Sequence, residues 1–452
     1  MRSYENILIQ ILNIFLALIP NFIFPIVLGL DVYGAYVGAI ASIFFISKLS
    51  ESSFDTALMM DTSGEARYSL VSIYRQIIPA KIFASILLFL LITYIQSSGV
   101  QLLVLLLLVM QLLSATSVSL LYSLNIKNKI LLFLGIANVL LISLSIYFYT
   151  INASEFYVIG CMILFNFLMY VSASVIVYIG YNGKEEYKLP SNKRLAGFVM
   201  QSLGSNFLNG GIVLVSSFFY SGERLGIFKV ATSVVQAATS FFPVNLKTIL
   251  TVFVKNKGCE IQYTYFRNFL GVSILLFSPS FFVPLFLGVL KDVEMFAVII
   301  SPLLKFESQL YWMVPAITMF FIVMLLEKAV LAFYNLKKAV IISVVSTIIN
   351  LLVAILLIKI YNYGPEFSYL LSCITYILIV SVLNIELLKS ALKELLALTS
   401  LVVIYFTCLN LQVIDFLAID LAIQVIFSVI LLNRLNVIRV TEYKNTIKEK
   451  LI

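Results

Sequence analysis

Histidine is absent from the 452-residue sequence, and cysteine is scarce. Without histidine the chain lacks the commonest general base, the commonest transition-metal ligand and the usual switch near neutral pH. The four cysteines, Cys161, Cys259, Cys373 and Cys408, show no C-x-x-C spacing, and three of them fall in apolar runs. A thiol in such a run behaves as a small hydrophobic side chain. We therefore expect no cofactor, no metal site and no disulfide framework.

Charge is also scarce. Charged residues make up 12% of the chain and hydrophobic residues 62%, whereas soluble domains average about 25% charged and roughly 45–50% apolar residues. Many apolar runs exceed the ~20 residues that a helix needs to cross a bilayer. This composition predicts a polytopic, all-α membrane protein. The segment "GYNGK" (Gly180–Lys184) lacks the spacing of a P-loop, so ATP is not the expected energy source.

Apolar runs bounded by polar or charged turns predict fourteen membrane spans. They lie near 7–30, 33–58, 76–98, 99–123, 128–150, 156–180, 194–220, 223–254, 262–290, 309–333, 338–360, 364–388, 392–411 and 413–433. The first run is longer than the apolar region of a signal peptide and contains Pro20 and Pro25, so we expect an uncleaved first span. The polar segments between the runs are short and leave no room for a soluble domain.

Lysine and arginine are distributed unevenly between the two sides of these predicted spans. Alternation of the loops places most of them, together with the C-terminal tail, on one side, and only Arg224, Lys291, Lys305 and Lys359 on the other. The positive-inside rule puts the lysine-rich side and both termini in the cytoplasm. Much of the net charge of +8 therefore reflects topology, and a nucleic-acid partner is not expected.

Two short motifs recur in the second half of the chain in the same order. The motif "DVYGAY" at Asp31–Tyr36 matches "ERLGIF" at Glu223–Phe228, and "YSLNIKNK" at Tyr122–Lys129 matches "FYNLKKA" at Phe333–Ala339. Transporters often carry such repeats. The repeats predict two six-helix lobes.

The predicted lobes span residues 1–182 and 190–390. An extra helix pair at 391–433 and a basic cytoplasmic tail at 434–452 follow them.

These features resemble the polysaccharide-export branch of the multidrug/oligosaccharidyl-lipid/polysaccharide exporter superfamily, above all the O-antigen flippases. The likeness spans residues 5–390, and four sequence elements carry it: "YGAY" after an early span, "LGIFKVA" in mid-chain, "NLKKA" before a helix with Asn350, and "YNYGPEFSYLLS" at Tyr361–Ser372. The resemblance implies a MATE-like bundle of 12–14 helices, in two lobes around a central cavity that opens alternately to either side.

The resemblance also implies a function. A member of this branch would translocate an undecaprenyl-pyrophosphate-linked oligosaccharide, such as an O-antigen or other surface-polysaccharide repeat unit, across a bacterial inner membrane. Its partners would be this lipid-linked oligosaccharide, membrane lipids, a polysaccharide polymerase and a chain-length regulator.

Three charges share one face of the second predicted span. Lys48 and Asp55 are seven residues apart, hence about 20° apart around a helix, and Glu51 lies about 60° from Lys48. Because a charge in the bilayer is costly, this face should point into the bundle or a wet cavity. The alternative is an ion-paired set near the cytoplasmic end, with Asp55 emerging into the headgroups.

Two lysines mark the corresponding helix of the second half. Lys229 and Lys247 are eighteen residues apart and share an azimuth at about 27 Å along the axis. Spaced cations of this kind suit a pyrophosphate that crosses between leaflets. The alternative for each lysine is ordinary snorkelling to the membrane interface.

Glu327 and Lys328 are adjacent and diverge by about 100° around their helix. We therefore expect that they do not face the same neighbour, and that either lines the cavity or pairs with another helix. If an ion gradient drives transport, Glu51, Asp55 and Glu327 are the candidates to carry the ion.

Asparagine and glutamine mark two equivalent spans. Asn13 lies in the first and Gln201 and Asn206 lie in the seventh, where their amides suit hydrogen bonds to sugar hydroxyls. An equally good reading is interhelical hydrogen bonding without cargo.

Two other functions stay open. A cation-coupled drug exporter of the same superfamily would favour a more acidic cavity than the deep Lys48 and Lys229 provide. A membrane polysaccharide polymerase or ligase would need a large external loop with catalytic basic residues, and the longest external segment, Leu290–Ser308, is short. We therefore expect a transporter and not an enzyme.

Overall fold

The computed structural model describes a defined set of residues. They are 24–26, 29–34, 37–38, 41, 45, 136, 139–140, 142–144, 146–148, 150–151, 192–220, 222–239, 246–255, 260–281 and 307–411. Contacts divide the chain into two units. Unit 1 comprises Met1–Ser233 with Leu336–Thr347, and unit 2 comprises Val234–Asn335 with Ile348–Ile452. The expected lobes rest on the sequence repeat and stay a prediction.

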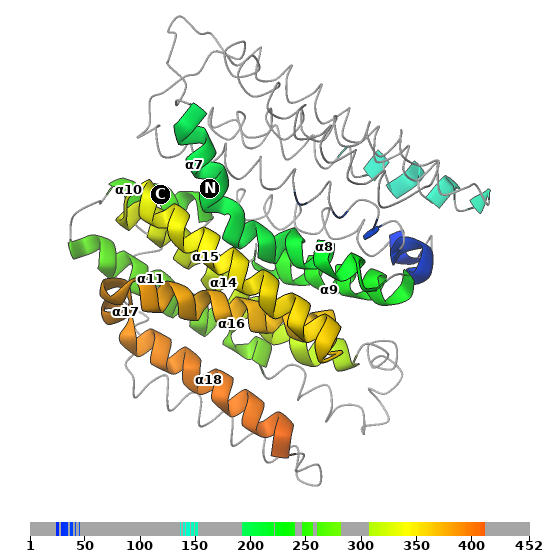
Figure 1. The fold of residues 1–452 in the computed structure, drawn as a ribbon. Coiled ribbons are helices and arrows are strands. Elements are labelled where there is room, and N and C mark those ends of the chain that lie inside the picture. Colours follow the sequence, from blue (N-terminus) through cyan, green and yellow to red (C-terminus); the bar gives the residue numbers. More distant parts are fainter. Residues whose placement is uncertain are drawn as a thin grey trace, which may run out of the picture. The chain divides into compact units, whose positions relative to one another are not determined.

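Every regular element in the described ranges is a helix, as the composition predicts (Figure 1). The elements are α7 (Asn192–Asn206), η1 (Phe207–Gly211), α8 (Ile212–Ser217), α9 (Gly222–Thr239), α10 (Leu246–Lys255), α11 (Glu260–Phe277), η2 (Ser278–Phe281), α14 (Glu307–Phe333), α15 (Leu336–Ile355), η3 (Leu356–Ile360), α16 (Pro365–Leu383), α17 (Ile385–Ser390) and α18 (Leu392–Leu411).

Four helical stretches in the described residues are long and apolar enough to cross a membrane. They are Ala196–Ser217, Tyr311–Phe333, Leu336–Ile360 and Pro365–Leu383. Each falls on a predicted span and begins or ends within a few residues of it. The largest difference is at 364–388, because Asn384 leaves the helical conformation (φ −134, ψ 69) and α17 begins after it. A helix also occupies the predicted run 392–411, whereas 413–433 lies outside the described residues.

Local sequence sets the sharp turn between η3 and α16. The helix ends as Asn362 adopts a positive φ of 52, a conformation that asparagine tolerates better than most residues. The N–H groups of Tyr361 and Tyr363 donate back to the carbonyls of Leu356 and Leu357. Pro365 then starts α16, where its missing N–H is of no consequence.

The centre of unit 2 is α14, which packs against α16, α10 and α11. Where α10 and α11 meet the end of α14, five rings form one cluster: Phe253, Tyr263, Phe266, Phe269 and Phe333, with centroid distances of 5.0–6.3 Å. Edge-to-face packing of this kind is favourable beyond the apolar area that it buries. The cluster ties three helices together at one end.

Polar contacts join the N-terminal half of α14, at Thr318, to α11 and η2. The Thr318 hydroxyl donates to the Phe277 carbonyl at 2.7 Å and lies 2.8 Å from the Ser280 hydroxyl. Phe277 and Ser280 lie where α11 passes into η2, so Thr318 joins α14 to this junction. Helix α18 packs against α11, and the Tyr405 hydroxyl donates to the Tyr311 carbonyl of α14.

In unit 1, the N-terminal segment 30–45 runs beside α8 and α9; it is helical at its described positions (Figure 1). Glycines make the approach close. A Cβ at Gly38 would lie 3.8 Å from the Ser217 Cβ, and a Cβ at Gly210 would lie 3.5 Å from the Phe45 Cα. The described contacts run antiparallel, because Gly38 lies beside the end of α8 and Phe45 beside η1, which precedes α8.

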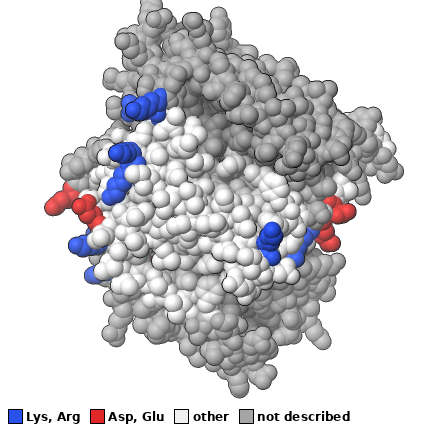
Figure 2. All heavy atoms as spheres, in the orientation of Figure 1, with Lys and Arg blue, Asp and Glu red and all other residues white. Residues whose placement is uncertain are grey.

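Charged side chains are few on the described face that Figure 2 draws. Figure 2 shows described Lys, Arg, Asp and Glu side chains at two opposite edges, and an uncharged described surface between them. Large apolar side chains such as Ile348, Leu352 and Leu378 are more than half exposed, at 54%, 55% and 59%. Such a face matches the hydrocarbon of a membrane.

Candidate functional site

Four polar side chains are buried in the span formed by α7, η1 and α8. Gln201, Ser202, Ser205 and Asn206 are each at most 3% exposed. The Asn206 amide donates to the Ser202 carbonyl at 2.9 Å, and the Ser202 hydroxyl donates to the Val199 carbonyl at 3.0 Å. Two of the predicted cargo-binding residues, Gln201 and Asn206, are therefore both buried in this span.

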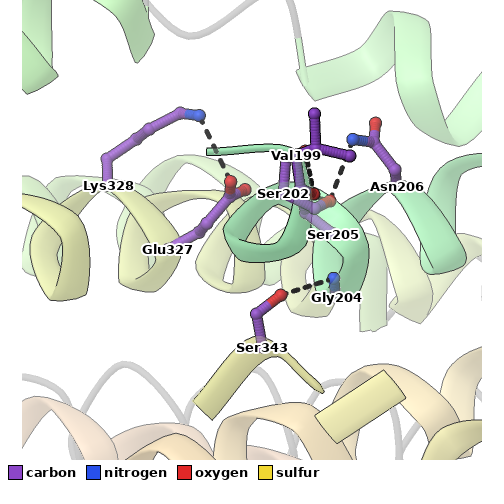
Figure 3. A network of polar contacts seen from close by, with 8 residues as sticks. All are labelled: Val199, Ser202, Gly204, Ser205, Asn206, Glu327, Lys328 and Ser343. Carbon is purple, nitrogen blue, oxygen red and sulfur yellow. Dashed lines mark hydrogen bonds and ion pairs between the residues drawn. The ribbon is translucent and has the colours of Figure 1, made fainter. Parts of the chain in front are cut away.

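The backbone of the same span is irregular near these residues. The Gly204 N–H donates to the Ser343 hydroxyl of α15 at 2.7 Å (Figure 3). In a regular helix this donor serves the carbonyl four residues earlier. The π-helical turn η1 follows at Phe207–Gly211. Turns of this kind are frequent at functional sites, so the span combines buried polar groups with a backbone that departs from a uniform helix.

On α14, Glu327 and Lys328 form a buried ion pair. The Lys328 Nζ lies 3.5 Å from the Glu327 Oε1, and the side chains are 11% and 2% exposed, respectively. Figure 3 shows the lysine stem folding back toward the carboxylate. The long, flexible lysine stem spans the 100° that separates the two Cβ atoms, so the charges pair within one helix. Each charge thus compensates the other in an apolar interior. The expectation that either residue lines the cavity or pairs with another helix stays a prediction.

On α9, a lysine and two hydroxyls occupy one stretch of helix. The Lys229 carbonyl accepts hydrogen bonds from the Thr232 and Ser233 hydroxyls, both at 2.9 Å. Both hydroxyl residues are buried, and Lys229 is half-buried. Satisfying these hydroxyls within the helix lets α9 carry polar side chains through an apolar environment.

The remaining predicted residues are untested by the structure. The backbone of Lys247 is part of α10, but its side chain is outside the description. Asn13, Lys48, Glu51 and Asp55 all lie outside the described residues. Their roles stay predictions.

Other buried polar residues were not predicted as part of a site. Ser343 holds the Gly204 N–H, and its spacing of three and seven residues from Ser346 and Asn350 marks one face of α15. That spacing was the available signal. Glu366 and Glu394 are 4% and 2% exposed although each sits in the first turn of its helix, a position where a helix stabilises an acid.

Metal-binding geometry is not found in the described part of the chain. No three His, Cys, Asp or Glu residues lie together there in a way that could hold a metal ion. The buried charge of the described residues is arranged as the pair of Glu327 and Lys328 and as acids at helix starts.

Comparison with known proteins gives likenesses in structure and none in sequence. No protein-family model and no curated protein sequence matches the chain. The fold is similar to that of the lipid II flippase MurJ in an inward closed conformation, with a TM-score of 0.60 and 17% identity over 94% of this chain and 97% of that chain.

Multidrug transporters have a similar fold. An inward-facing multidrug resistance MATE family transporter of the MOP superfamily gives a TM-score of 0.50 at 15% identity over 87% of this chain and 98% of that chain. A MATE transporter in complex with MaL6 gives 0.51 at 13% identity over 88% and 96%. The chain thus shares its fold with these flippase and MATE structures, and the all-α, polytopic fold class predicted from the sequence is confirmed.

Proposed function

We propose that this protein is a flippase that moves an undecaprenyl-pyrophosphate-linked oligosaccharide across a bacterial inner membrane by alternating access. The observation that carries the proposal is the full-length likeness to a lipid II flippase, which exceeds the likeness to the two MATE transporters in TM-score. The cargo would be an O-antigen or other surface-polysaccharide repeat unit. Both termini would lie in the cytoplasm.

Two described features support an anionic, hydroxyl-rich cargo. Lys229 is a half-buried cation of α9, and the Thr232 and Ser233 hydroxyls on the same helix bond its backbone carbonyl, so α9 offers both charge and hydrogen-bonding groups. The buried amides of Gln201 and Asn206 add donors and acceptors on α7. A polymerase and a chain-length regulator would act on the cargo after translocation.

The pair of Glu327 and Lys328 supports coupling to an ion. A cation bound at the Glu327 carboxylate would compete with the buried Lys328 ammonium for its counter-charge, and an uncompensated buried charge is costly. Ion binding at this pair would therefore be felt by the packing around α14. The same pair favours the second candidate function, a cation-coupled drug exporter.

The test is translocation by the purified protein in sealed liposomes. A fluorescent polyprenyl-pyrophosphate oligosaccharide is reconstituted with the protein, and dithionite added outside quenches the label that reaches the outer leaflet. We expect quenching beyond the half present at the start, and no such gain for a labelled phospholipid. Quenching no faster than in protein-free liposomes would contradict the flippase function.

Lys229 is tested in the same assay. Lys229→Ala should slow translocation about tenfold or more, because it removes roughly one charge-assisted contact to the cargo in a site of low dielectric. Lys229→Arg keeps the charge and should keep part of the rate. Lys359→Ala, which removes an exposed lysine near the end of η3, is the matched control and should translocate normally. A full rate for Lys229→Ala would remove Lys229 from the cargo path. Export of a cationic dye instead of the oligosaccharide would favour the drug exporter.

A further inference from the structure

The two copies of the repeated motif touch each other in unit 1 through their glycines. Gly34 of "DVYGAY" and Gly226 of "ERLGIF" are equivalent in the repeat. A Cβ on Gly34 would meet the Gly222 carbonyl and lie 2.9 Å from the Gly226 nitrogen. A Cβ on Gly226 would lie 2.5 Å from the Leu30 oxygen and 3.3 Å from the Gly34 nitrogen.

This contact is reciprocal. Leu30 precedes Gly34 by four residues, as Gly222 precedes Gly226. The Cβ position of each glycine therefore points at the other motif. It faces the backbone nitrogen of the equivalent glycine and the carbonyl four residues before that glycine. A contact in which residue i meets j and residue j meets i is the mark of a twofold relation. The two motifs meet at the local axis of the sequence repeat.

The contact is made by backbone on backbone. At Gly34 any side chain would occupy the position of the Gly222 carbonyl, so the two helices can approach this closely only where both carry glycine. Both helices also begin here: Gly29 and Gly222 have positive φ angles of 78 and 59. The crossing thus brings two helix ends together backbone against backbone, with the Asp31 carboxylate beside Gly222.

Polar groups continue inward from the crossing along α9. Lys229 and Ser233 follow Gly226 by three and seven residues, so they lie about 60° and 20° from it around the helix. The face of α9 that makes the glycine contact at one end therefore carries a cation and a hydroxyl deeper in the span. Arg224 stands at the crossing end, which the positive-inside rule assigns to the external side.

We propose that the Gly34–Gly226 crossing is the external gate of the transport path. It is shut in this structure, and the two motifs part about their local axis when cargo leaves toward the outside. The proposal rests on the proposed function insofar as it requires a transporter, but it does not depend on the cargo.

The first test uses a cysteine placed behind the crossing. Gly38→Cys is one helical turn further in, where a Cβ makes an ordinary 3.4 Å contact with the Leu225 side chain. In a full-length chain with its native cysteines replaced by alanine, a membrane-impermeant maleimide added outside should label this site slowly. Addition of Gly226→Val should separate the two helices at the crossing and raise the labelling rate about tenfold or more. A change of this size is expected when an open state that is rarely populated becomes the main one.

A matched glycine variant controls for general loosening. Gly197→Val also adds a side chain at a close helix contact, but a Cβ there meets the tip of the Leu336 side chain at 2.8 Å, which can move. It should leave the labelling of Gly38→Cys unchanged. Equal labelling with and without Gly226→Val, in protein that elutes as a single folded species, would overturn the proposal.

The second test locks the gate and decides the matter if Gly226→Val fails to fold. The Cβ positions of Gly38 and Ser217 are 3.8 Å apart, the usual separation across a disulfide. The double variant Gly38→Cys/Ser217→Cys should lose its activity in cells or liposomes on oxidation and regain it with reductant. Full activity of the oxidised, cross-linked protein would overturn the gate. Because labelling needs no cargo, a wrong cargo assignment would leave the first test intact.

Discussion

Helices α14 and α15 are both apolar spans, yet their surroundings differ. Buried residues make up 78% of the apolar stretch of α14 but 33% of that of α15. Helix α14 carries the Glu327–Lys328 pair in the middle of unit 2, whereas α15 buries one narrow stripe that includes Ser343, Ser346 and Asn350. The comparison teaches that hydropathy identifies a span but not its neighbours. In lipid, an apolar side chain is equally suited to a protein contact and to an acyl chain.

The largest effect should come from breaking the ion pair on α14. Glu327→Ala leaves the buried Lys328 ammonium without its partner and should destabilise the protein by about 3–5 kcal/mol. The measurement is thermal unfolding of the purified protein in detergent. The double variant Glu327→Gln/Lys328→Met removes both charges at similar volume and should be close to wild type. A double variant as unstable as the single one would show that the pair does not act as a unit.

Leucine truncation should separate the two helices next. Leu325 on α14 is 0% exposed and Leu352 on α15 is 55% exposed. Leu325→Ala opens a cavity in the packed centre of unit 2 and should cost about 2–5 kcal/mol. Leu352→Ala should change the free energy of unfolding by less than about 0.5 kcal/mol. Equal costs, compared by unfolding in the same detergent, would contradict the assignment of α15 as the more exposed helix.

Within the buried stripe of α15, two polar residues should respond in opposite directions. Among the described contacts, both side-chain amide atoms of Asn350 have no hydrogen-bond partner and the residue is 0% exposed. Asn350→Leu should therefore stabilise the protein by about 1–2 kcal/mol, because it removes unsatisfied buried groups. Ser343→Ala should destabilise it by about 1 kcal/mol, since the Gly204 N–H loses its acceptor. A loss of stability in both variants would show that Asn350 has a polar partner in the membrane. If Asn350→Leu is more stable but inactive in translocation, the amide serves function at the expense of stability.

The smallest effect should come from Tyr334, at the junction between the two helices. Burial is the main cause that raises the pKa of Tyr334 to about 12, and the nearby Tyr263 and Glu386 add to it. Below pH ~10, Tyr334 is neutral in both the folded and the unfolded chain, so its full contribution to the free energy of unfolding is present there. The unfolded chain ionises first, and the contribution is lost as pH rises from about 10 to 12.

Because Tyr334 is partly exposed, solvent screening should limit this loss to under ~1 kcal/mol. The midpoint of thermal unfolding, followed between about pH 9 and pH 11.5, should fall less steeply for Tyr334→Phe than for wild type. Parallel curves for the two proteins would show that folding does not raise the pKa of Tyr334.

Much of the fold follows from the sequence. Long apolar runs predicted four described spans within a few residues, because a run of ~20 apolar residues has few stable alternatives in a bilayer. The bounds failed where local chemistry intervened: Asn384 ended a helix inside the run predicted as 364–388. A single asparagine in an apolar run is a weak signal for such an end.

The site was harder to predict than the fold. Gln201 and Asn206 were proposed from their amides alone, and the sequence did not indicate the π-helical turn beside them or the bond from Gly204 to Ser343, which joins residues 139 positions apart. The azimuths of Glu327 and Lys328 describe Cβ atoms and not the tips of long side chains, so they did not indicate that the two charges pair with each other. The motif glycines Gly34 and Gly226 were recognised as a repeat, but their contact is a tertiary fact that no single motif contains.

The most direct test of the account is deletion of the gene for this chain in the organism that carries it. Surface polysaccharide and lipid-linked repeat units are then measured together in the mutant and in a strain that re-expresses the protein. The account predicts that surface polysaccharide is lost, that lipid-linked repeat units accumulate on the cytoplasmic side, and that wild-type protein reverses both changes. Normal surface polysaccharide with no accumulation of lipid-linked units would contradict it.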